Sequence, residues 1–116
     1  LRRAQDAPLV KEIGYYSDDY LLVDVPQHRV LRAGVPVHLT QTEFTILALL
    51  VQHRGRVISV ERILREVWGA EASLTGARSV RVYIRYLRQK IEPDPSHPRY
   101  VRTERHLGYT FNPQRT

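Results

Sequence analysis

Four arginines recur in one segment of the sequence at intervals of three or four residues: Arg78, Arg81, Arg85 and Arg88. On an α-helix, where successive residues turn by about 100°, these side chains fall within an arc of about 80°. A guanidinium group binds phosphate oxygens, and it also pairs with the O6 and N7 atoms of guanine. The spacing therefore indicates a helical face that binds a polyanion.

The distribution of charge supports this interpretation. The net charge is +6, and residues 76–116 carry the whole excess, with nine Lys or Arg and three Asp or Glu. Like charges four residues apart on a helix repel each other, and a face that only needs to be solvated more often mixes both signs. A basic surface confined to one end is typical of nucleic-acid-binding proteins. The alternative is a basic tail that only keeps the chain soluble.

Three other side chains of this segment flank the arginines. Val82 and Tyr86 are placed to touch a base, a sugar or a thymine methyl group. Tyr83 lies nearer the apolar side of the helix, so its hydroxyl either reaches a phosphate or only keeps the tip of a boundary aromatic residue hydrated.

Two helices are expected to support the arginine face. Thr40 and Glu43 have the spacing of a capping box, which opens an apolar helix that we expect to end at Gly55. Ser59 is expected to cap a second helix with one apolar stripe, and Gly69 to close it.

The arginine segment itself is predicted to be a third helix from about residue 77 to 91, which must stop before Pro93. Residues 99–103 and 107–111 then have the pattern of two strands joined by the tip Glu104–His106. A short β-ribbon with an arginine at its tip suits a narrow minor groove, where the negative potential is strongest.

The N-terminal part has the pattern of short strands. The strand-like runs cover residues 20–25, 28–32 and 35–39, with a further candidate at 13–16, and turn residues separate them. The sequence therefore predicts an α+β domain with a small antiparallel sheet, three helices and a hairpin. Apolar residues make up 42% of the chain, which suits one domain with a single core.

Several motifs occur in the order found in a known family. Leu39-Thr40-Gln41-Thr42-Glu43-Phe44, residues 55–59, Val67-Trp68-Gly69, residues 78–91 and Gly108-Tyr109-Thr110-Phe111 resemble the OmpR/PhoB-type winged-helix DNA-binding domains of bacterial two-component response regulators. The resemblance covers about residues 12–112. It implies a winged helix-turn-helix fold and sequence-specific binding to double-stranded promoter DNA.

The resemblance also implies which residues bind. The third helix would enter the major groove with Arg78, Ser79, Arg81, Val82, Tyr83, Arg85, Tyr86 and Arg88. The hairpin, or wing, would contribute Arg102, Thr103, Arg105 and His106, with Arg105 in the minor groove. The segment expected to be a loop between the second and third helices would contact RNA polymerase: Gly69, Ala70, Glu71, Ala72, Ser73, Leu74 and Thr75.

Further expectations concern the longer protein. The chain lacks an initiator Met, and residues 1–11 resemble the end of a receiver domain followed by a linker. Residues 12–113 would form the winged-helix domain and 114–116 a tail. Two copies would bind DNA as a tandem homodimer, and the protein would be cytoplasmic, because no run of about 18 apolar residues could span a membrane.

The sequence departs from the family pattern at three candidate contacts. Position 81 is usually Asp or Asn, position 86 is often a base-reading Arg, and a Gly is common at position 106; here they are Arg81, Tyr86 and His106. The arrangement around Arg81, Tyr83 and residues 89–90 is closer to the potassium-response branch than to the phosphate-response branch. These changes concern the target sequence rather than the ability to bind DNA.

Other functions have little support in the sequence. With no Cys there is no disulfide, the five His lack metal-ligand spacing, and no glycine-rich phosphate loop or nucleophile elbow is present. Asp18-Asp19 is interpreted as a turn. We therefore expect no enzyme, cofactor or metal. The alternatives are an interaction module of the same fold that binds an acidic protein, and a small hydrolase or nuclease.

Overall fold

The computed structural model describes residues 13–113, so the predicted linker (1–11) and tail (114–116) lie outside the described residues. The chain begins with a four-stranded antiparallel sheet in the order β1-β2-β3-β4. Its strands are β1 (Tyr15–Ser17), β2 (Leu21–Asp24), β3 (Arg29–Arg32) and β4 (Val35–Pro36). Leu21, Val23 and Val30 turn one face of the sheet towards the helices and are buried. The predicted antiparallel sheet is confirmed, but its first strand lies at 15–17 rather than 13–16, and β4 covers only residues 35–36 of the predicted 35–39.

Three long helices follow, as predicted: α2 (Gln41–Gln52), α3 (Val60–Trp68) and α5 (Ala77–Ile91). The Thr40 hydroxyl accepts a hydrogen bond from the Glu43 amide, and the Glu43 carboxylate accepts one from the Thr40 amide, which completes the capping box. Helix α2 ends at Gln52, earlier than expected, and Gly55 follows in a turn with a positive φ of 87°.

The connection between α3 and α5 is not the loop that the sequence suggested. It forms a 3₁₀ turn (Gly69–Glu71) and the single helical turn α4 (Ala72–Thr75). The segment contains no proline and is rich in good helix formers, so it can be helical without an apolar period. Leu74 is 87% exposed on this turn. The Ser73 side chain lies outside the described part of the structure.

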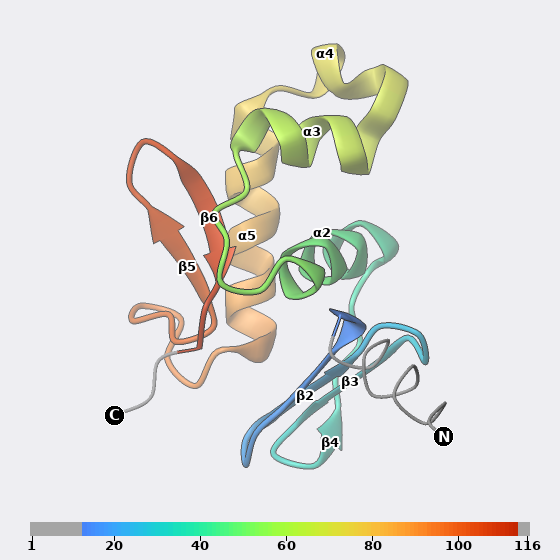
Figure 1. The fold of residues 1–116 in the computed structure, drawn as a ribbon, viewed down its shortest axis with the longest axis vertical. Coiled ribbons are helices and arrows are strands. Elements are labelled where there is room, and N and C mark those ends of the chain that lie inside the picture. The colour runs from blue at the N-terminus through green and yellow to red at the C-terminus, as the bar shows by residue number, and fades with distance from the viewer. Residues whose placement is uncertain (1–12, 114–116) are drawn as a thin grey trace, which may run out of the picture.

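The chain ends in a hairpin of β5 (Val101–Glu104) and β6 (Gly108–Phe111), paired antiparallel. Figure 1 shows this hairpin beside α5, with the four-stranded sheet towards one end of the molecule and α3 and α4 towards the other. Both strands are shorter than predicted. Strand β5 begins two residues late because the amides of residues 99–101 bind a carboxylate instead of a partner strand.

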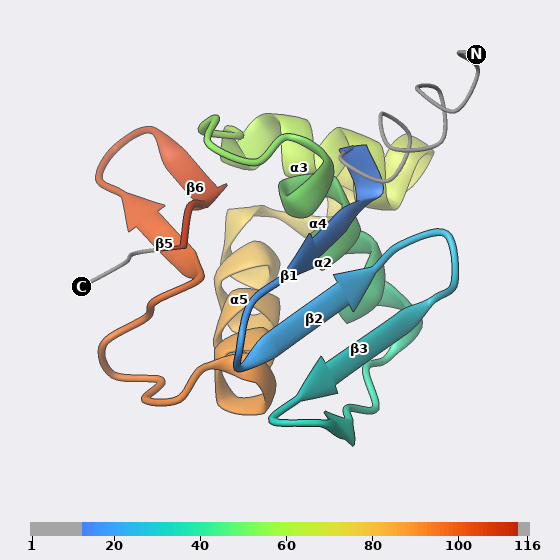
Figure 2. The same ribbon diagram turned by 60° about the horizontal axis from the view of Figure 1, so that its bottom comes forward.

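The core lies where the sheet, α2, α5 and the hairpin meet; Figure 2 shows the sheet in front of α2 and α5, with the hairpin beside α5. Ile46, Leu47 and Leu50 of α2 are fully buried there, as are Phe111 of β6 and Tyr100 just before β5. Helix α5 packs against α2 and α3, and Arg88 links it to β5. Among the described residues, no helix is long and apolar enough to cross a membrane.

Candidate nucleic-acid interface

Helix α5 has the two faces that the arginine spacing predicted. Val80, Ile84, Leu87 and Ile91 are at most 1% exposed and anchor the helix in the core. Arg78, Arg81 and Arg85 lie on the exposed side. Burial on one side and three exposed cations on the other leave this helix with a single orientation, arginines outward.

The remaining predicted contacts on α5 differ in exposure. Tyr86 is 38% exposed, whereas Val82, Tyr83 and Ser79 are half-buried. The Tyr83 ring lies between Trp68 at 5.7 Å and Tyr86 at 5.9 Å, measured between centroids. The Ser79 hydroxyl donates to the Thr75 carbonyl at 3.2 Å, so it helps to close the first turn of α5. The row of aromatic rings formed by Trp68, Tyr83 and Tyr86 thus joins α3 to the exposed edge of α5.

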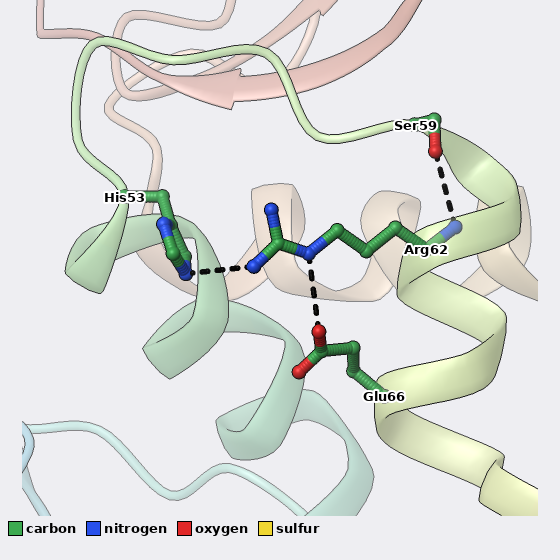
Figure 3. A network of polar contacts seen from close by, with 4 residues as sticks. All are labelled: His53, Ser59, Arg62 and Glu66. Atoms are coloured by element: carbon green, nitrogen blue, oxygen red, sulfur yellow. Dashed lines mark hydrogen bonds and ion pairs between the residues drawn. The ribbon is translucent and has the colours of Figure 1, made fainter.

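A polar network fixes α3 against α2 (Figure 3). The Ser59 hydroxyl caps α3 by accepting from the Arg62 amide at 3.1 Å. The Arg62 guanidinium then joins Glu66 at 3.1 Å and the Nε2 atom of His53 at 3.2 Å, where α2 ends. Since α3 also packs on α5, the network helps to hold α2, α3 and α5 in their relative positions.

Arg88 differs from the other three arginines of the predicted face. Its Nε donates to the Val101 carbonyl at 2.9 Å, and its Nη2 donates to the Thr103 hydroxyl at 2.8 Å. Its guanidinium also lies 5.9 Å from the centroid of the Tyr109 ring. Burial lowers the pKa of Arg88 from its usual value. The side chain joins α5 to the hairpin.

Glu92 makes a second link between α5 and the hairpin, and the sequence analysis did not identify it. Its carboxylate is fully buried and accepts hydrogen bonds from the amides of Arg99, Tyr100 and Val101 at 2.7–3.2 Å. A negative charge just after the C-terminal end of a helix is disfavoured by the helix dipole. This unfavourable position is the one feature of the sequence which indicates that Glu92 has hydrogen-bond donors elsewhere in the fold.

The predicted contact residues of the wing differ in their exposure to solvent. Arg105 and His106 are exposed in the turn between β5 and β6, Thr103 is exposed on β5, and Arg102 is half-buried. His106 has a φ of 67°, in the left-handed region that favours glycine. Gly108, with a φ of 145°, approaches Ile58 so closely that a Cβ atom would lie 2.1 Å from its carbonyl oxygen.

A groove of about 520 Å³ lies between α5 and the wing. Arg81, Arg85 and Arg88 line it from α5, and Thr103 and Tyr109 line it from the hairpin. The two elements predicted to bind a polyanion therefore share one concave, basic surface. Ser79 and the segment 69–75 do not line this groove.

The charge of this surface is not neutralised by the domain. Within residues 13–113, Arg78, Arg81 and Arg85 take part in no ion pair; the ion pairs join Arg62 to Glu66, Lys90 to Glu43, and His97 to Asp94. Uncompensated guanidinium groups beside one another attract an anion with several negative charges. In the same part of the chain, no group of three or more His, Asp or Glu could hold a metal ion.

An N-terminal sheet, three helices with a basic third helix, and a C-terminal hairpin define a winged helix-turn-helix domain. Residues 34–111 match the family model described as "Transcriptional regulatory protein, C terminal", and the chain belongs to that family. Members of this family are DNA-binding domains of transcriptional regulators and not enzymes. The resemblance to OmpR/PhoB-type domains is confirmed.

Curated relatives of known name agree with this assignment. Over 93 residues the chain is 42% identical to the transcriptional regulatory protein KdpE of Mycobacterium tuberculosis, which covers 80% of this chain and 41% of the relative. It is 39% identical over 104 residues to the KDP operon transcriptional regulatory protein KdpE of Escherichia coli, covering 90% of this chain and 43% of the relative. The chain thus spans about two fifths of the length of these relatives.

Solved structures show the same fold. The response regulator DrrB, an OmpR/PhoB homologue of Thermotoga maritima, aligns with a TM-score of 0.80 and 31% identity over 95% of this chain and 49% of its own. The DNA-binding domain of Klebsiella pneumoniae RstA, solved in complex with the RstA box, aligns with a TM-score of 0.74 and 29% identity over 86% of this chain and 98% of its own. The chain is a response-regulator DNA-binding domain.

Proposed function

We propose that this domain binds one promoter sequence in double-stranded DNA, with α5 in the major groove and the wing in the adjacent minor groove. The basic groove shared by α5 and the wing carries the proposal. Arg81 and Arg85 line it from α5 and stand outside any ion pair of the described domain, and a helix of this kind fits a major groove. Such a protein would act in the bacterial cytoplasm, where the chromosome lies.

The sequence predicts Arg81, Arg85 and Arg88 as the main contacts. Because Arg88 is hydrogen-bonded to β5, we propose Arg81 and Arg85 as the principal ones, with Arg78, Ser79, Val82, Tyr83 and Tyr86 around them. A binding site selected from random duplexes should be titrated against a scrambled duplex of the same length. Arg81→Ala or Arg85→Ala should cost about 1–3 kcal/mol, with relaxed specificity if the residue reads a base and a uniform loss if it holds a phosphate. Arg29→Ala, on the exposed side of β3, is the control and should bind as the wild type does.

The wing is proposed to place Arg105 in the minor groove, with Arg102, Thr103 and His106 beside the backbone. A-tract sequence narrows that groove and deepens its negative potential. Flanking A-tracts should therefore raise the affinity of the wild type, and Arg105→Ala should remove most of this preference. A variant that keeps both its affinity and its flank preference would show that the contact is absent.

The exposed segment 69–75 is proposed to contact RNA polymerase. Leu74 is the most exposed large apolar side chain among the described residues, at 87%, and it has no packing role on α4. Leu74→Ser should leave affinity for the selected duplex unchanged and lower transcription from a promoter carrying that site. Equal transcription from the two proteins at equal occupancy would contradict this contact.

The alternative of the same fold is a module whose arginines bind an acidic protein. Specific DNA binding should weaken steeply with salt, because each phosphate contact releases counterions, and it should still prefer one sequence by about 10³-fold or more. Binding to all duplexes alike would favour the acidic-protein alternative. We also propose that a receiver domain precedes this domain and that two copies bind in tandem.

A further inference from the structure

We propose that Arg88 is a positioning residue, which orients the wing against the recognition helix so that the two elements fit adjacent grooves of DNA. The proposal rests on the proposed function, because it explains how the two DNA-binding elements are kept in register. It gives Arg88 a role different from those of Arg81 and Arg85, although the sequence places the three on one helical face.

Arg88 lines the groove, but its hydrogen bonds go to β5. Two nitrogens of its planar guanidinium bind the Val101 carbonyl at 2.9 Å and the Thr103 hydroxyl at 2.8 Å. The planar fork fixes both donors in one plane, so it sets the direction of the strand as well as its distance from α5. The side chain is half-buried, and burial lowers its pKa, whereas Arg81 and Arg85 are exposed.

Strand β5 is paired with β6 along its length, and the other attachments of the wing hold the base of the hairpin and β6. Glu92, one helical turn further along the chain, holds the base of the hairpin at the amides of residues 99–101. Strand β6 is fastened separately, through two backbone hydrogen bonds of 2.8 and 3.0 Å between Tyr109 and Ile58. Of these links, the Arg88–Thr103 bond lies nearest to the turn with Arg105 and His106 on β5. Losing it should therefore leave a folded hairpin that is still held through β6, but whose β5 side and tip are less firmly placed against α5.

The test is a double-mutant comparison on the duplex with A-tract flanks. Arg88→Lys keeps the charge and the apolar stem, but its single ammonium cannot reproduce the planar fork. In the wild-type background, Arg105→Ala should weaken binding by about tenfold or more. In the Arg88→Lys background it should weaken binding less than about twofold, because the wing is already misplaced, and the A-tract preference should be lost.

Arg85→Ala is the matched control. It acts from α5 itself, so it should cost the same factor in both backgrounds. The proposal is overturned if Arg105→Ala costs the same factor in the wild-type and the Arg88→Lys backgrounds, since Arg88 would then act on DNA independently of the wing. Thermal unfolding of each variant confirms that it is folded at the temperature of the titration.

A second measurement needs no DNA. Backbone ¹⁵N relaxation of the free domain should give lower order parameters at residues 104–107 in Arg88→Lys than in the wild type, with α2 and α3 unchanged. Equal order parameters overturn the positioning role even if the DNA titrations are uninformative. If no duplex is preferred by the wild type, the proposed function fails, while the relaxation data still decide whether Arg88 holds the wing.

Discussion

Three individual residues distinguish this surface from the usual OmpR/PhoB pattern, and all three lie where the core does not constrain them. Arg81 is exposed on α5, Tyr86 is 38% exposed beside it, and His106 is exposed in the wing turn. Changes at such positions alter what the surface can bind without altering the fold. Arg81 puts a cation where the family usually has an acid or amide, and Tyr86 puts an aromatic ring where it often has an arginine. Both changes affect which bases the surface can recognise.

His106 offers a residue-scale prediction that separates stability from binding. A non-glycine residue in the left-handed region costs about 1–2 kcal/mol, part of which is offset because glycine has more freedom in the unfolded chain. His106→Gly, at a φ of 67°, should therefore raise the free energy of unfolding by about 0.5–1 kcal/mol and lower the affinity for DNA.

Ala33→Gly is the control for this change, because Ala33 has a φ of 51° in the turn between β3 and β4 and is none of the proposed DNA contacts. It should give a similar gain in urea denaturation and leave DNA affinity unchanged. A loss of stability on His106→Gly would mean that a contact of the histidine side chain stabilises the fold by more than the backbone strain costs.

At the scale of elements, the sequence predicted what local chemistry determines. The bounds of α5 followed from its apolar period and from Pro93, and the capping box located the start of α2. The start of β5 and the role of Arg88 could not be predicted, because both depend on contacts between α5 and the hairpin. Helical periodicity places Arg88 beside Arg85, but only the packed hairpin brings Thr103 within reach of it.

The ion pair between α2 and α5 gives a prediction for pH. Burial of the Glu43 carboxyl raises its pKa, but hydrogen bonds from Lys90 and Thr40 outweigh this effect and hold the pKa below its usual 4.5. Because the pKa is lower in the folded state, the stabilisation is complete above about pH 4.5 and is lost as the pH falls through the folded-state pKa.

Glu43→Gln should accordingly lower the free energy of unfolding by about 1–3 kcal/mol at pH 7, since the Lys90–Glu43 bond is 2.6 Å long and its carboxylate is buried. The difference from the wild type should shrink between pH 5 and 3, measured by thermal unfolding. Glu66→Gln removes the exposed pair with Arg62 and is expected to cost only about 0.3–0.5 kcal/mol. A difference that is constant with pH would exclude this account of Glu43.

At the scale of the whole molecule, the N-terminal sheet is joined to α5 and the base of the wing through polar contacts. The Asp18 carboxylate closes a turn with the amides of Tyr20 and Leu21, as predicted, and also accepts hydrogen bonds from the hydroxyls of Tyr16 and Tyr100. Arg32 of β3 donates to the Lys90 carbonyl at the end of α5. The sheet therefore braces both α5 and the base of the wing.

The oligomeric state is the prediction that belongs to this scale. An obligate dimer generally buries about 2,000 Å² or more of rather apolar surface. Among the described residues the exposed large apolar side chains are scattered over separate elements: Ile13, Val35, Val57, Leu74, Tyr86 and Leu107. Such a surface does not supply an obligate interface. The free domain should sediment as a monomer, or as a weak dimer, at micromolar concentration.

On DNA, two copies should occupy one operator as a tandem repeat, an arrangement suggested by the family resemblance. Half-sites about 10–11 base pairs apart would place both copies on the same face of the duplex. Each copy alone would bind weakly, and the first would raise the local concentration of the second. Inserting five base pairs between the half-sites turns the second site to the opposite face and should abolish cooperative footprinting, whereas a ten-base-pair insertion, as the control, should restore part of it. A tight dimer in free solution, or protection that is indifferent to the five-base-pair insertion, would overturn the tandem arrangement.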